Sequence, residues 1–449
     1  MHRFKPSARC SLSPLGHLSQ QNSQRPRSST QWTKISSTQY TRPMDQMEKL
    51  IQKVFNEPFG QRTHDVAAVA RIKAPITTTD LEKKAKFAWK KLRLQHPLMG
   101  CVLQDDQWVY TAPTKEELDV WAQESFIPVE KARSEDVIRS IGPSDRPTLF
   151  YLKDSNEFLL HTAHDRLDGR GAGLWFHDFL TELSQCAATD PTWTSPGEEV
   201  HRLPPGPWPM ASTDFKEAWL KDAKGLPDKP HGVTIQKHEF SESGTQQIRD
   251  AARRQNTTVT PLLHSAVAIA MKEHANLPDG VQHNTYLISD VRNHCPGPCH
   301  TGSRAAALRM GFWPLQVPIR GFNEVVADLS AAYESFKRDA ETHLPVMPYV
   351  LDKMPSDIVH DILDSMLVSN MGNLSRFLPP SYRDIELMEY WAVALPAGSS
   401  LFFAFRTWNG RLAMRVCYDE HYYSQEQVQT VIQRICRIIR DVGMTDSLT

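Results

Sequence analysis

A proline-rich stretch at residues 190–212, DPTWTSPGEEVHRLPPGPWPMAS, interrupts the sequence near its middle. It shows little hydrophobic periodicity, and its prolines and glycines are typical of a connection between folded units. A chain of 449 residues is also too long for one ordinary hydrophobic core, and it suits two domains of about 150 to 200 residues each. The sequence therefore predicts an N-terminal domain over 40–189 and a C-terminal domain over 213–449, joined by a crossover linker over 190–212.

The expected N-terminal domain alternates strand and helix patterns. Alternating apolar residues predict strands over 68–74 and within 148–165. Helical spacing of apolar residues predicts a helix in the stretch 80–100, and Pro97 is expected to end this helix. A second helix is predicted over about 172–186. Strands and helices therefore alternate along this half of the chain.

The expected C-terminal domain mixes strands and helices in a similar order. Its clearest signals are a hairpin over 400–419, whose two strands meet at Asn409-Gly410, and a closing helix over 424–443. A buried helix over 259–271 and a strand over 285–292 precede them. The predicted fold class is therefore α/β (α+β), with an architecture that looks duplicated.

Residues 1–39 differ from the rest of the chain. The first 44 residues contain seven lysines or arginines and no acidic residue, and they are rich in serine and glutamine. This composition is typical of a disordered tail or of an organellar targeting segment. We expect the protein in the cytoplasm, with an organelle as the alternative.

Charge and hydropathy exclude two classes of protein. The chain has 51 basic and 52 acidic residues, a net charge of −1, so a nucleic-acid surface is not expected. No apolar run approaches the roughly 18 to 20 residues that a membrane-spanning helix needs. The seven cysteines are scattered and odd in number, which favours free thiols in a reducing compartment.

The segment HTAHDRLDGRGAG, residues 161–173, combines histidine, aspartate and glycine between a strand pattern and a helix pattern. A dinucleotide-binding loop would need a third glycine at position 174, which is Leu174, so phosphate binding is disfavoured. A general base fits the segment better, because His164 follows the end of a strand and imidazole titrates near neutral pH. From the residues alone, a surface histidine followed by an ordinary Asp-Gly turn fits equally well.

A metal site is the remaining interpretation of this segment. His161, His164 and Asp168 would share one face of a helix, but the segment begins as a strand. A second cluster, HCPGPCH at 294–300, has two cysteines and two histidines. Zinc sites usually need a spaced partner cluster, which the sequence lacks, and Pro-Gly-Pro predicts a turn. We therefore expect no metal.

His164-Asp165-Arg166-Leu167-Asp168-Gly169 matches the H-x-x-x-D-G signature and resembles the chloramphenicol acetyltransferase-like superfamily. This superfamily includes peptide condensation domains and plant-type BAHD acyltransferases. Within it, the chain is most similar to stand-alone fungal O-acyltransferases of secondary metabolism, such as the trichothecene O-acetyltransferase type. Further similar segments extend the resemblance over about residues 40 to 445: TTVTPLLHSAVAIAM, ISDVRNHCP, VSNMGNLSRF and the terminal hairpin and helix.

The resemblance implies two similar αβ domains that flank a central tunnel. It implies that His164 is the general base, that Asp168 pairs with Arg292 to fix the loop, and that Gly169 allows the turn behind His164. Asn370 and Gly372 would line the tunnel and hold the oxyanion. No metal and no resident cofactor are implied.

The implied reaction moves an acyl group from acyl-CoA, a cosubstrate, to a hydroxyl of a small secondary metabolite. One alternative is a condensation or offloading enzyme that uses a carrier protein in trans to form an ester or amide. Another is an inactive homologue that binds a ligand. The position before the base is Ala163, where many condensation domains have a second histidine, and the plant-type D-F-G-W-G segment is absent. A monomer is expected, because a duplicated chain can form its site alone.

Overall fold

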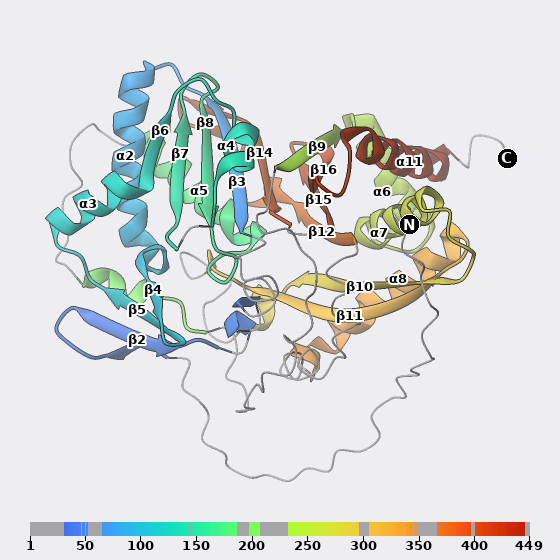
Figure 1. Ribbon diagram of the computed structural model, residues 1–449, viewed down its shortest axis with the longest axis horizontal. Coiled ribbons are helices and arrows are strands. Elements are labelled where there is room, and N and C mark those ends of the chain that lie inside the picture. The colour runs from blue at the N-terminus through green and yellow to red at the C-terminus, as the bar shows by residue number, and fades with distance from the viewer. Residues whose placement is uncertain are drawn as a thin grey trace, which may run out of the picture.

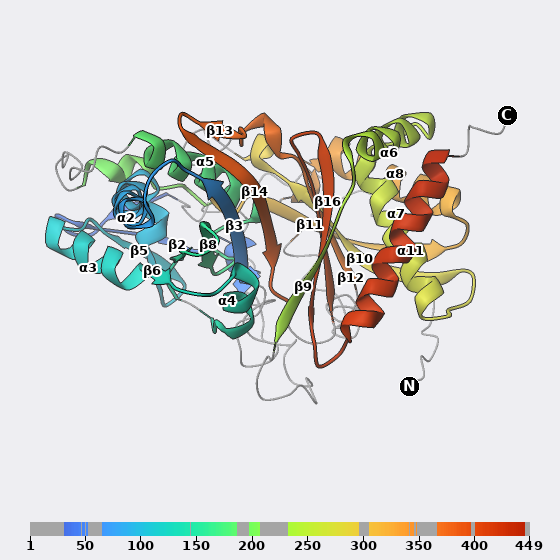
Figure 2. The ribbon, with the colours of Figure 1, turned by 90° about the horizontal axis from the view of Figure 1, so that it is seen from above.

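The computed structural model describes residues 31–45, 47–49, 51–52, 65–143, 145–185, 197–206, 232–295, 305–340, 342–344, 347, 366–396 and 400–444. Two lobes lie side by side, each a sheet with helices packed on its outer side (Figures 1 and 2). The predicted mixture of helices and strands in two similar lobes is confirmed.

The N-terminal lobe is built on a six-stranded sheet of order β13-β14-β3-β8-β7-β6. Its strands are β3 (Val66–Lys73), β6 (Phe126–Val129), β7 (Thr148–Leu152), β8 (Glu157–Thr162), β13 (Ser381–Tyr382) and β14 (Ile385–Ala394). Its helices are α2 (Thr78–Gln95), α3 (Lys115–Ser125), α4 (Ser134–Ser140) and α5 (Gly169–Gln185). A small sheet of β1 (Thr33–Lys34), β2 (Gln39–Pro43), β5 (Gln107–Thr111) and β4 (Val102–Gln104) flanks it, with the 3₁₀ helices η1 (Pro97–Gly100) and η2 (Glu198–Arg202).

The C-terminal lobe has a four-stranded sheet of order β12-β15-β16-β9 and a separate antiparallel pair, β10-β11. The strands are β9 (Val233–Glu239), β10 (Val281–Asp290), β11 (Met310–Ile319), β12 (Met366–Asn373), β15 (Leu401–Trp408) and β16 (Arg411–Asp419). The helices are α6 (Glu242–Arg254), α7 (Val259–His274), α8 (Phe322–Arg338) and α11 (Gln425–Met444), with the 3₁₀ turns η3 (Arg292–His294) and η5 (Leu374–Arg376).

Two of the expected boundaries need correction. Residues 33–43 form the β1-β2 hairpin, and the Trp32 indole donates to the carbonyl of Pro204 at 2.8 Å, so the fold begins within the expected tail 1–39. The segment 381–394, which was expected in the C-terminal domain, forms β13 and β14 of the N-terminal sheet, where β14 pairs with β3. The C-terminal half of the chain therefore completes the N-terminal lobe. Parts of the expected linker 190–212 lie outside the described residues.

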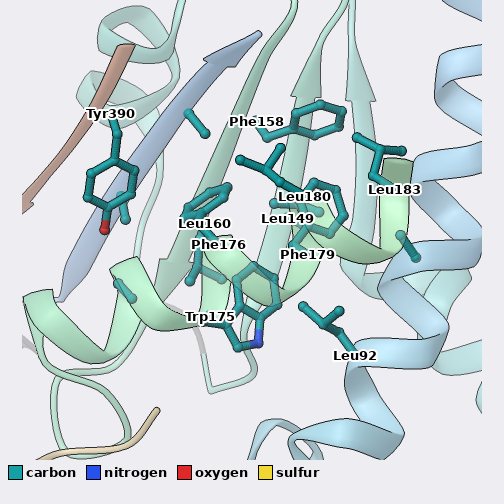
Figure 3. Close-up of a cluster of buried hydrophobic side chains, with 14 of the residues drawn as sticks. Leu92, Leu149, Phe158, Leu160, Trp175, Phe176, Phe179, Leu180, Leu183 and Tyr390 are labelled. Atoms are coloured by element: carbon teal, nitrogen blue, oxygen red, sulfur yellow. The ribbon is translucent and has the colours of Figure 1, made fainter. Parts of the chain in front are cut away.

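Helix α5 is held against the N-terminal sheet by aromatic packing (Figure 3). Trp175, Phe176 and Phe179 are fully buried, and the rings of Trp175 and Phe179 stack with centroids 5.9 Å apart. The spacing of these residues places them on one helix face, so their burial fixes the rotation of the helix. The start of α5, at Gly169, follows directly from the H-x-x-x-D-G loop, so this packing also positions the loop.

The inner faces of the two sheets meet in a shared core between the lobes. Val69 on β3 and Trp391 on β14 pack into the same apolar cluster as Leu367 on β12 and Phe402 on β15. Helices cover the outer face of each sheet, so this shared cluster, here called the seam, joins the two inner faces. Strands β14 and β15 run beside one another at the seam. The seam is where an enclosed site can form between the lobes.

The hairpin between β15 and β16 forms as its sequence predicts. Asn409 and Gly410 have φ angles of 48° and 76°, the left-handed conformation that a two-residue hairpin turn requires. The turn pairs Trp408 with Arg411 and Ala404 with Arg415, which fixes the face on which each side chain of β15 lies.

Candidate active site

His164 lies just beyond the end of β8, in a turn over residues 164–166. Its side chain lines a cavity of about 560 Å³, counting the space that opens to solvent. Burial lowers the pKa of His164 below its usual value, although a hydrogen bond to its own backbone and the carboxylates of Asp168 and Asp65 oppose this shift. The imidazole is therefore neutral at pH 7 and able to accept a proton.

The cavity lies at the seam between the lobes. Among the described residues, two polar side chains line it, those of His164 and Ser369. The other lining residues are glycine or apolar: Val66, Gly169, Ile288, Met310, Phe312, Leu367, Met371, Ala392, Val393, Ala394, Phe402 and Ala404. An apolar wall with few polar groups is typical of a small-molecule site.

Asp168 does not line the cavity; it fixes the loop. Its Oδ1 accepts hydrogen bonds from the backbone N–H of Gly171 at 2.6 Å and from Arg292 Nη2 at 2.8 Å. Its Oδ2 accepts from the backbone N–H of Arg309 at 2.6 Å. Burial alone would raise the pKa of Asp168, but Arg292 and these N–H donors hold it below its usual value, so Asp168 is a carboxylate.

Arg292 is the first residue of the turn η3, two residues beyond the last residue of β10, and not on the strand. Besides Asp168 it donates to Asp290 Oδ1 at 2.8 Å, to the Ala305 carbonyl at 2.9 Å and to the Ala307 carbonyl at 3.0 Å. Its side chain is 4% exposed, so the ion pair with Asp168 is buried and joins the two halves of the chain. Removing either partner of such a pair leaves the other charge buried and unpaired, which destabilises the fold.

The expected role of Gly169 needs correction. Gly169 is the first residue of α5 and lacks a positive φ, and the turn behind His164 is formed by residues 164–166. Space, rather than backbone freedom, explains the glycines of this segment. A Cβ on Gly169 would approach Met371 Sδ at 3.3 Å, and one on Gly171 would lie 2.9 Å from the Ala307 carbonyl oxygen.

We expect Gly171→Ala to lower the free energy of unfolding by about 1 to 3 kcal/mol, because the added methyl overlaps backbone that also accepts from Arg292. Gly142→Ala is the matched control, since a Cβ there meets nothing within 4 Å. Urea unfolding followed by tryptophan fluorescence measures both changes. Equal stability of the two variants would contradict the close packing of α5 against residue 307.

Asn370 and Gly372 are not among the residues that line the cavity. On β12 the side chains alternate, and Ser369 and Met371 face the cavity instead. Asn370 donates to Thr260 Oγ1 at 3.0 Å and accepts from the N–H of Gly372 at 2.9 Å. Gly372 has φ +73° in a bulge where the register of β12 shifts. Strand periodicity in VSNMG could have pointed to Ser369.

His161 is a strand residue that pairs with Asp65 at 3.0 Å, and both side chains are buried. Within the described part of the chain, no group of three or more His, Cys, Asp or Glu side chains could hold a metal ion. Most of the HCPGPCH cluster, residues 296–300, lies outside the described residues. The metal interpretation of residues 161–168 therefore has no support in the geometry.

No pattern in the sequence pointed to one part of the site, the segment 305–309. Its backbone bonds to the loop twice: the Leu308 N–H donates to the Arg166 carbonyl at 3.1 Å, and the Arg309 N–H donates to Asp168. Arg166 in turn donates to the carbonyls of Leu98 at 2.6 Å and Cys101 at 3.0 Å. The loop is thus held from both lobes.

Taken with the site, this architecture is the chloramphenicol acetyltransferase-like fold. The TRI3 trichothecene 15-O-acetyltransferase from Fusarium sporotrichioides matches with a TM-score of 0.74 at 15% identity, over 92% of this chain and 97% of that one. The first condensation domain of the calcium-dependent antibiotic synthetase matches with a TM-score of 0.57 at 13% identity, over 92% and 97%. The expected resemblance is therefore confirmed at the level of the fold.

In sequence, the chain is similar to the acetyltransferase pigO of Monascus ruber, with 24% identity over 92% of this chain and 99% of that protein. No protein-family model matches the chain. Relatives that are named acetyltransferases support an acyltransferase activity. Among the described residues, no helix is both long and apolar enough to cross a membrane.

Proposed function

We propose that the protein is an acyl-CoA-dependent O-acyltransferase that acylates a hydroxyl of a small secondary metabolite. The observation that carries the proposal is His164, a buried imidazole that stays neutral beside an apolar cavity between the lobes. The buried Asp168–Arg292 pair holds the loop that bears it. The acetyltransferase names of the relatives agree with this chemistry.

In the proposed reaction, His164 takes the proton from the acceptor hydroxyl as its oxygen attacks the thioester carbonyl. A C–O bond forms, and the tetrahedral intermediate collapses by breaking the C–S bond. The imidazolium then returns the proton to the departing thiolate, so the enzyme ends as it began. Acyl-CoA serves as the cosubstrate, and the mechanism uses no covalent acyl-enzyme and no resident cofactor.

We infer that the hydroxyl of Ser369 stabilises the oxyanion of this intermediate. In the part of the chain that the structure describes, it is the polar side chain that shares the cavity with His164, whereas the amide of Asn370 is already bonded to Thr260 and Gly372. A hydrogen bond to developing charge in a water-poor site stabilises the transition state more than the ground state. The apolar wall also limits competing hydrolysis by excluding water.

A carrier-protein-dependent condensation or offloading enzyme is the second candidate. The shared fold with a condensation domain favours it, because such domains have the same two-lobe architecture. Parallel assays with acetyl-CoA and with an acetylated acyl carrier protein separate the two candidates. Turnover with CoA supports the first proposal, and turnover with the carrier protein alone supports the second. An inactive, ligand-binding homologue would turn over neither.

The pH dependence of kcat/KM should report the lowered pKa of His164. The base works only when neutral, so the rate falls as the pH drops through this pKa and is level above it. Because burial places the pKa below its usual value of about 6.5, we expect the acidic limb to lie below pH 6.5. A limb centred above that pH would contradict the assignment of a desolvated imidazole as the base.

A further inference from the structure

A second polar position lies at the end of the cavity, on strand β15. Side chains alternate along a strand, so Phe402, Ala404 and Arg406 share one face of β15. Phe402 and Ala404 both line the cavity. Arg406 is therefore the next residue on the cavity-facing side, one step beyond Ala404.

The guanidinium of Arg406 is buried without a close partner. The residue is 4% exposed, and its nearest acid is Glu239, whose Oε2 lies 3.9 Å from Nη2. Its Nε is buried and has no acceptor among the residues that the structure describes. Burial accordingly lowers the pKa of Arg406. Buried cations in proteins are ordinarily paired and hydrogen-bonded, so this one has unused donors.

Arg415 on the neighbouring strand shows the ordinary arrangement. It donates to Glu389 Oε1, and its guanidinium lies over the Trp391 ring, 4.3 Å from the centroid. Arg415 pairs with Ala404 in the hairpin register, so the two arginines lie close to one another on the same sheet. Nε has no acceptor in either arginine, so the two differ in their terminal nitrogens: Arg415 donates to Glu389, whereas Arg406 has its nearest carboxylate oxygen at 3.9 Å.

Tyr390 on β14 supplies a second unused polar group beside Arg406. Tyr390 lies two residues before Ala392, a residue that lines the cavity. Arg406 has the same spacing on β15, where it lies two residues after the lining residue Ala404. Tyr390 is fully buried, and its hydroxyl has no hydrogen-bond partner among the described residues. Figure 3 shows the ring extending from β14 next to Phe176, with its hydroxyl directed toward helix α5. Burial raises the pKa of Tyr390, and the nearby charge of Arg406 opposes that shift.

The charges around Arg406 favour an anion. Three cations, Arg71, Lys237 and Arg415, share the carboxylate of Glu389. Two more, Arg406 and Arg411, share the carboxylate of Glu239. Glu135 also acts on Arg415 and Asp168 on Tyr390, so the five cations face four carboxylates and remain in excess by one charge.

We propose that Arg406 and Tyr390 form a recognition site for a carboxylate of the substrate at the end of the cavity. The proposal rests on the proposed acyl transfer and specifies its substrate class. A carboxylate can accept from the planar guanidinium and from the phenol together, which satisfies donors that now have no acceptor. The carboxylate can belong to the acceptor alcohol or to a dicarboxylic acyl group on the thioester.

Two matched pairs of substrates distinguish these sources. The acceptor pair is para-hydroxymethylbenzoate and its methyl ester, each with acetyl-CoA. The donor pair is succinyl-CoA and butyryl-CoA, each with benzyl alcohol. We expect the wild-type protein to prefer the carboxylate member of one pair by about tenfold or more in kcat/KM, because the neutral analogue leaves buried donors unpaired.

Arg406→Met should abolish this preference by slowing only the carboxylate substrate, and Tyr390→Phe should reduce it. Arg411→Met is the control, since Arg411 is half exposed and also pairs with Glu239. The proposal is overturned if the wild-type protein shows no preference in either pair, or if Arg406→Met keeps it. Thermal unfolding of each variant verifies that it is folded.

Calorimetric titration of para-hydroxymethylbenzoate without a thioester separates this proposal from the proposed function. The wild-type protein could bind this carboxylate, lose the binding in Arg406→Met, and yet transfer no acyl group. That result would support the carboxylate site and refute the proposed acyl transfer. Acyl transfer at equal rates within both substrate pairs would support the proposed function and refute the carboxylate site.

Discussion

Replacing Arg292 by methionine should lower the free energy of unfolding by about 3 to 5 kcal/mol, because it leaves the buried carboxylate of Asp168 without its cation. The same change removes the donors to the carbonyls of Ala305 and Ala307. The methionine side chain fills a volume similar to that of the Arg292 side chain, so a new cavity should contribute little to the loss of stability. Urea unfolding monitored by circular dichroism measures the difference.

Arg253→Met is the matched control for this prediction. Arg253 also pairs with an aspartate, Asp250, at 2.8 Å, but the pair is exposed on α6. Solvent screens such a pair, so the control should leave the stability nearly unchanged. Equal effects of the two substitutions would show that the Asp168–Arg292 pair does not hold the fold together.

Replacing His164 by alanine should lower kcat by about 100- to 10,000-fold, the usual contribution of a general base. The KM for acyl-CoA should change little, because the apolar wall that binds the acyl group is intact. Release of free thiol from acetyl-CoA in the presence of an alcohol gives both constants. The fold should be retained, since the buried ion pair of the loop does not include His164.

His201→Ala is the control, because His201 is exposed on η2 and does not line the cavity. It should turn over at the wild-type rate. If His164→Ala does the same, another group removes the proton and the assignment of the base is wrong.

Local sequence signals predicted the elements that depend on neighbouring residues. Pro97 ends α2 as expected, and Asn409-Gly410 forms the turn of the β15-β16 hairpin. Both rely on backbone conformations that one or two residues decide. The pairing of Asp168 with Arg292 spans 124 positions, and it was expected only through the family resemblance.

The features that sequence reasoning missed depend on contacts between distant segments. Strand β14 has no local feature that assigns it to the N-terminal sheet, because its pairing with β3 is set by the packing of the lobes. The local pattern predicts a turn at Gly169, whereas in the fold it begins α5, and a Cβ there would lie 3.3 Å from Met371 Sδ across the seam. Arg406 stands in an ordinary strand pattern, and only the fold reveals that its charge is buried without a close partner.

Transfer of label from acetyl-CoA is the most direct test of the central proposal. The wild-type protein and His164→Ala are each incubated with acetyl-labelled CoA thioester, with and without a panel of small alcohols. We expect thiol release by the wild-type protein, label in an ester when an alcohol is present, no lasting label on the protein, and little release by the variant. Equal thiol release by the two proteins under every condition, or label that stays on the protein, would contradict direct transfer by His164.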